Sequence, residues 1–86
     1  MTSTNTILNQ NYSNFTFDPT TYNTLKPHIQ KVISLFNKHK IKKVTLEDCF
    51  QISMTLLQIK LDLETIKQIT YYTYHLTQLN PKILNQ

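Results

Sequence analysis

The sequence contains no glycine, and this limits how its 86 residues can turn. Glycine adopts positive φ angles without a steric penalty, whereas Asn, His or Lys reach them at a higher energy. Helix ends and sharp turns must therefore use such residues. A chain of this length forms at most one domain and buries a smaller fraction of its surface than a larger domain does. We therefore expect its stability to depend on a partner.

Three helix-start signals follow a polar N-terminal part. Asp18 precedes a proline, Thr45 precedes two acids, and Asp62 precedes a leucine and a glutamate. Each signal places a capping side chain, with proline or acidic residues, at a helix N-terminus. Pro27 suits the first turn of a helix and disrupts an interior, so it predicts a short helix over residues 19–25 and a main helix from residue 26 to about 38.

The later signals predict a helix over residues 46–58 and another over residues 62–79, which Asn80 and Pro81 end. The fold class is thus all-α, with three to four short helices. Residues 1–17 lack helical periodicity and are expected to form a disordered or extended arm, although their aromatic side chains could dock on the body. Residues 18–80 form the helical domain, and residues 81–86 form a tail.

The helix over residues 46–58 is apolar around most of its circumference, because its polar side chains occupy one narrow arc. Such a helix is normally enclosed by more than one neighbour. A single chain of this length can hardly supply them all. We therefore expect an obligate protein partner.

Nine lysines against five acids give a formal charge of +4, and the chain has no arginine. Lysine attracts phosphates or acidic surfaces as a point charge but lacks the bidentate fork with which arginine reads guanine. Nucleic acid is therefore a less favoured partner than protein. Four lysines of one loop could contact phosphate or an acidic surface, or could simply be solvated: Lys38, Lys40, Lys42 and Lys43.

No residue pattern indicates catalysis, a metal site or a cofactor. Cys49 lies on an apolar helical face, where a thiol is usually a core residue, and one cysteine forms no internal disulfide. The histidines lack metal-ligand spacing, and a chain without glycine has no glycine-rich phosphate loop. We see no secretory signal and no membrane-spanning run. We therefore expect a non-enzymatic protein in a reducing intracellular compartment that does not insert into membranes.

Residues 29–56 contain a helix with apolar residues at Ile29, Val32, Ile33 and Phe36, followed by a twelve-residue stretch from Asn37 to Asp48. Val44 is the eighth residue of that stretch. This region resembles an EF-hand of the calmodulin and centrin kind, in which a β-branched residue occupies loop position eight. The resemblance covers one degenerate hand and half of a possible second, in which Pro81 would take position eight.

The calcium ligands of that family are missing here. Ile41 offers no oxygen at position five, Lys42 replaces the invariant glycine, and Asp48 is shorter than the usual glutamate. The resemblance therefore implies a lobe that holds an amphipathic partner helix without calcium. The apolar side chains that we expect to line the partner-binding groove are Phe50, Met54, Leu57, Ile66 and Tyr72.

Two alternatives remain open. The lysine-rich loop followed by Thr45, Glu47 and Asp48 also resembles the start of the last core helix of a histone fold. That reading implies pairing with another histone-fold chain near DNA, but it requires a long helix through Pro27 and a further helix before residue 18. The second alternative is a plain structural subunit of a multiprotein complex.

Overall fold

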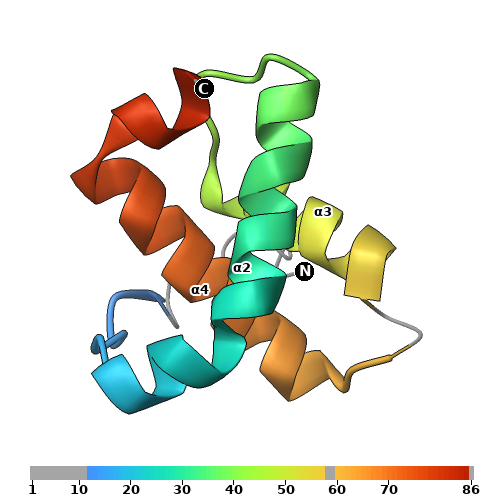
Figure 1. The fold of residues 1–86 in the computed structure, drawn as a ribbon. Helices are drawn as coiled ribbons and strands as arrows, with labels where there is room; N and C mark the ends of the chain where they lie inside the picture. The colour runs from blue at the N-terminus through green and yellow to red at the C-terminus, as the bar shows by residue number, and fades with distance from the viewer. Residues whose placement is uncertain (1–11, 58–59, 86) are drawn as a thin grey trace, which may run out of the picture.

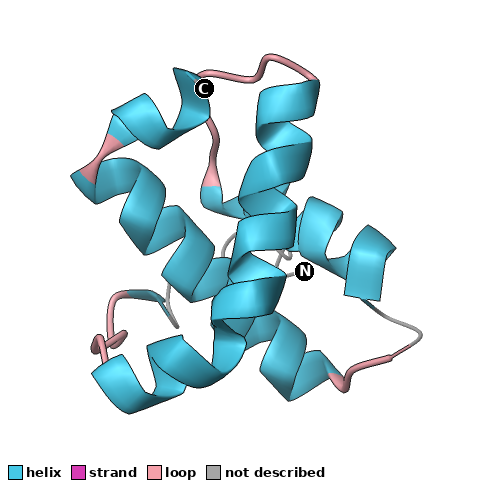
Figure 2. Cartoon of the chain, in the orientation of Figure 1, coloured by secondary structure: helices cyan, strands magenta, loops and turns pink. Residues whose placement is uncertain are grey.

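The computed structural model describes residues 12–57 and 60–85, and this part of the chain is all-helical, without strands. Three α-helices are followed by a short 3₁₀ helix: α2 (Pro19–Lys38), α3 (Leu46–Leu57), α4 (Leu63–Leu79) and η1 (Pro81–Asn85). Figures 1 and 2 show α2 crossing in front of α4, while α3 begins behind α2 and emerges to its right. The all-α prediction is confirmed, while residues 1–11 of the predicted arm and Gln58 of the second predicted helix lie outside the described residues.

Pro27 does not separate two helices, so the predicted division of residues 19–38 is wrong. A single helix, α2, continues through it. Its blue-cyan N-terminal part runs at an angle to the remainder (Figure 1), as expected for a proline kink. Pro27 and Asn23 are both exposed, so water can bond the Asn23 carbonyl that the proline leaves without a donor. The Asp18 side chain caps this helix by accepting from the Thr20 amide and the Thr21 hydroxyl.

The start of α3 is fixed by a reciprocal cap. The Asp48 amide donates to Thr45 Oγ1 at 3.1 Å, and the Thr45 amide donates to the Asp48 carboxylate at 3.1 Å. This is a capping box with aspartate in place of the usual Glu or Gln. The helix predicted from residue 46 therefore begins where its sequence signal places it.

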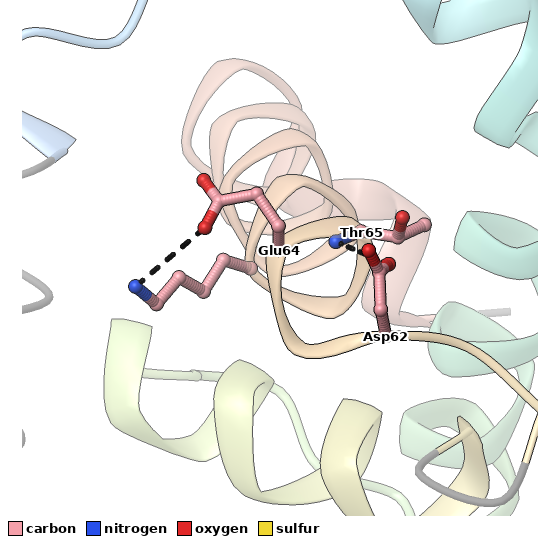
Figure 3. Close-up of polar contacts among 4 residues, drawn as sticks. Asp62, Glu64 and Thr65 are labelled. Atoms are coloured by element: carbon pink, nitrogen blue, oxygen red, sulfur yellow. Dashed lines mark hydrogen bonds and ion pairs between the residues drawn. The ribbon is translucent and has the colours of Figure 1, made fainter.

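The N-terminus of α4 is capped by one side chain, that of Asp62. Its carboxylate accepts from the Thr65 amide at 3.1 Å, and Glu64 pairs with Lys67 at 3.9 Å one turn along (Figure 3). The helix ends at Leu79, where the Asn80 amide donates to the Leu76 carbonyl. Both ends match the predicted bounds to within one residue.

The core is built around α4, which packs against α2, α3 and η1. Its main cluster joins buried side chains of all four helices with Val44 of the α2–α3 loop. The buried residues of this cluster are Leu25, Ile29, Val32, Phe36, Val44, Cys49, Leu57, Ile66, Ile69, Tyr72 and Leu84. Leu84 belongs to the predicted tail, and Phe15 of the predicted arm packs against the cluster. Residues on both sides of the predicted 18–80 domain therefore contribute to the packed body.

Candidate functional site

Three of the five residues predicted to line a partner groove lie inside this chain. Leu57, Ile66 and Tyr72 are only 2–3% exposed and belong to the main core cluster. They are covered within the same molecule, where α3 and α4 pack together and the Tyr72 ring meets Phe15 and Tyr22. In this conformation the predicted groove is therefore an internal helix contact.

The other two predicted groove residues, Phe50 and Met54, are half-buried on one flank of α3. Phe50 packs against a second cluster, formed by Leu46 and Tyr71. Tyr12 of the N-terminal segment packs against the same cluster. The apolar flank that sequence reasoning offered to a partner is thus partly covered by the chain itself.

Aromatic rings hold the N-terminal segment on α4. The Phe15 ring meets Tyr72 edge-on at a centroid distance of 4.9 Å, and the Tyr12 ring meets Tyr74 edge-on at 5.1 Å. The Tyr72 hydroxyl also accepts from the Asp18 amide at 3.0 Å and donates to the Asp18 carbonyl at 3.3 Å. Residues from Tyr12 onward are therefore part of the packed structure and not a free arm.

The loop between α2 and α3 turns at Lys40, whose φ of 58° is left-handed. The Lys40 amide donates to the Asn37 carbonyl and the Ile41 amide to the Phe36 carbonyl, which defines a Schellman motif. In the EF-hand alignment the glycine turn would fall at Lys42, which does not have a positive φ. Membership of that family stays a prediction.

The four loop lysines do not form one site. Lys42 and Lys43 border a hollow against the end of α4, whereas Lys38 lies on α2 beside Leu56 of α3. Lys40 is exposed at the turn. The sequence cluster is therefore divided among three places on the surface.

The surface that contains Lys38 is a shallow groove between α2 and α3, with a volume of about 270 Å³. We call it the α2–α3 groove. Its apolar side chains are Leu56, which is 40% exposed, and the half-buried Leu35. Its remaining lining comes from one side of α2: Lys31, Ser34 and Lys38.

Sequence reasoning did not single out Lys31, Leu35 or Leu56 as binding residues. The signal was present in the spacing, because Lys31 and Lys38 lie four residues before and three residues after Leu35. That spacing places all three on one side of a helix. Leu35 falls outside the stripe of Ile29, Val32, Ile33 and Phe36, so the apolar periodicity alone does not indicate it.

The part of the chain that the structure describes contains no group of three or more His, Cys, Asp or Glu side chains that could hold a metal ion. Cys49 is fully buried, and burial, with a smaller effect of Asp48, raises the pKa of its thiol to about 12. The thiol is therefore protonated at neutral pH, whereas a cysteine nucleophile must ionise. His75 packs against the Phe15 and Phe17 rings.

No protein-family model, curated protein sequence or solved structure matches this chain. None of the helices within residues 12–57 and 60–85 has the length and apolar character needed to cross a membrane.

Proposed function

We propose that this protein is a non-catalytic interaction subunit that binds an amphipathic helix of a partner protein in the α2–α3 groove, without calcium. The observation that carries the proposal is the pairing of Leu56, 40% exposed, with the half-buried Leu35 in one groove. Isolated exposed leucines are common, but an exposed leucine beside a half-buried one on a concave surface can accommodate an apolar ridge of a partner helix.

Charge at the groove specifies the kind of helix. Lys31 and Lys38 are exposed at its rim, and no acidic residue is among its lining. An amphipathic helix with acidic residues beside its apolar ridge would complement both features. The lysines would guide its approach and register, while most of the affinity would come from burial of apolar surface.

The calcium independence of the proposal rests on the loop. Lys42 and Ile41 occupy positions where a calcium loop needs glycine and an oxygen ligand, and the left-handed turn falls at Lys40 instead. The proposed groove would therefore bind its partner equally with and without calcium.

The histone-fold alternative gains one observation, since α2 continues through Pro27. The preceding helix that it also requires would fall largely in residues 1–11, outside the described part. Binding to duplex DNA that weakens steeply with salt, and also on replacement of Lys42 and Lys43 by Gln, would favour this alternative.

The test of the proposed function is affinity capture from the native cell at about 0.15 M salt, using the tagged wild-type chain and two variants. Leu56→Asp places a charge in the groove. Leu79→Asp is the matched control, because Leu79 is 70% exposed and lies outside the groove. Circular dichroism establishes that both variants are folded.

We expect one stoichiometric partner that wild type and Leu79→Asp retain and that Leu56→Asp loses. A double charge reversal, Lys31→Glu with Lys38→Glu, should weaken the same partner. Equal retention by all variants would refute the groove as the binding site, and loss with Leu79→Asp alone would place the contact at the end of α4.

A further inference from the structure

A second concave surface lies where the α2–α3 loop meets the end of α4 and η1. It has a volume of about 480 Å³, within the range of small-molecule sites, and shares no residue with the α2–α3 groove. We call it the loop hollow. Its lining residues are Lys42, Lys43, Val44, Thr45, Leu46, Tyr74, Thr77, Gln78, Pro81 and Leu84.

The polar groups of the loop hollow include several donors and no carboxylate. Lys42 and Lys43 bring two positive charges. Thr45 Oγ1 already accepts from the Asp48 amide, so its hydroxyl hydrogen remains available to a ligand. The exposed Gln78 amide is a further donor, whereas the Thr77 hydroxyl donates to the Tyr74 carbonyl.

The helix ends contribute little net field. α3 begins at Leu46 and presents its positive end to the hollow, while the last turn of α4 presents its negative end. These two effects oppose each other, so the lysines determine the sign of the charge that is favoured. The loop hollow therefore suits an anion.

Apolar side chains make up the rest of the surface. Val44, Leu46 and Leu84 are 3–5% exposed and form its floor, and Pro81 borders it. A bare inorganic anion would use only the polar part of this lining. A ligand with an anionic group and an apolar body would use both parts of the lining.

We propose that the loop hollow binds a phosphate monoester, with the phosphate held by Lys42, Lys43 and Thr45 and the organic group on Val44 and Pro81. A dianionic phosphate matches the two lysine charges and accepts several hydrogen bonds. The concave shape and small volume favour a compact ligand over an extended nucleic-acid backbone, which needs lysines spread along its path. This site goes beyond the proposed function and does not depend on it.

The test is an NMR titration of the full-length, ¹⁵N-labelled chain with three probes: adenosine monophosphate, phosphotyrosine and inorganic phosphate. We expect saturable amide shifts in residues 42–46 and 74–78, with at least one of the two monoesters binding more tightly than inorganic phosphate. The tighter monoester identifies the source of the phosphate group, a free nucleotide or a phosphorylated side chain.

The double variant Lys42→Gln with Lys43→Gln should weaken binding of the tighter monoester by about tenfold or more. Its matched control is Lys26→Gln with Lys60→Gln, two exposed lysines outside the hollow. Equal weakening in both double variants would indicate non-specific attraction and overturn the proposal. The absence of saturable shifts, or equal affinity for inorganic phosphate and both monoesters, would also overturn it.

Discussion

Replacing Lys40 by glycine should stabilise this protein, because Lys40 is held at a φ of 58° in the turn that ends α2. A left-handed conformation costs a residue with a Cβ about 1–2 kcal/mol relative to glycine. Glycine in turn lowers stability by about 0.4–1 kcal/mol, because it makes the unfolded chain more flexible. The difference predicts a rise of about 0.5–1 kcal/mol in the free energy of unfolding, or a Tm higher by about 4 °C.

Urea denaturation followed by circular dichroism measures this change. Lys42→Gly is the matched control, since Lys42 is an exposed lysine of the same loop without a positive φ. It should lose about 0.4–1 kcal/mol. Lys40→Gln removes the charge while keeping the Cβ and should change stability little. If Lys40→Gly loses stability as Lys42→Gly does, the explanation from backbone conformation is refuted.

Three further predictions concern the core and the N-terminal segment. Tyr72→Phe removes the hydroxyl that bonds the Asp18 amide and carbonyl, and should lower the free energy of unfolding by about 1 kcal/mol in a urea titration. Burial raises the pKa of Cys49 from 9.0 to about 12, so the unfolded chain releases this proton at lower pH than the folded one. Stability should therefore be full below pH 9 and fall above it by about 1.4 kcal/mol per pH unit, a slope that Cys49→Ala should flatten. Phe15→Ala should lower stability by about 1–3 kcal/mol, more than Phe17→Ala, because Phe17 is 37% exposed; a change no larger than about 0.5 kcal/mol would mean that the segment is not docked.

The helix starts could be predicted because each depends on a few neighbouring residues. Asp18, Thr45 and Asp62 all accept a hydrogen bond from an amide in the first turn of the helix that follows. Such caps are local, and their side chains identify them in the sequence. The left-handed residue at the end of α2 is Lys40. The sequence predicts a residue with a side chain at such a turn, because the chain has no glycine.

The sequence alone could not show what covers the predicted groove. Helical periodicity identifies an apolar face, but it does not show whether a helix of the same chain or a partner protein packs against that face. The sequence pattern predicts that Tyr72 and Leu57 face a partner, but the same chain buries both, Tyr72 against Phe15 and Leu57 in the main core cluster. The Pro27 prediction was wrong for a related reason. Whether a proline ends a helix or bends it depends on tertiary packing and on access of water to the freed carbonyl.

The lack of alanine and glycine explains an unusual feature of the packed helices. Ser53 of α3 and Thr73 of α4 are fully buried, and their hydroxyl groups make no hydrogen bond within the described protein. Thr70, equally buried, donates to the Ile66 carbonyl in its own helix. Small side chains at such positions fill little space, and in this chain Ser and Thr take the place that Ala takes elsewhere. An unpaired buried hydroxyl costs about 1–3 kcal/mol. Since a partner that binds only the folded state shifts the equilibrium toward it, occupation of the α2–α3 groove would compensate for this weakness in the core.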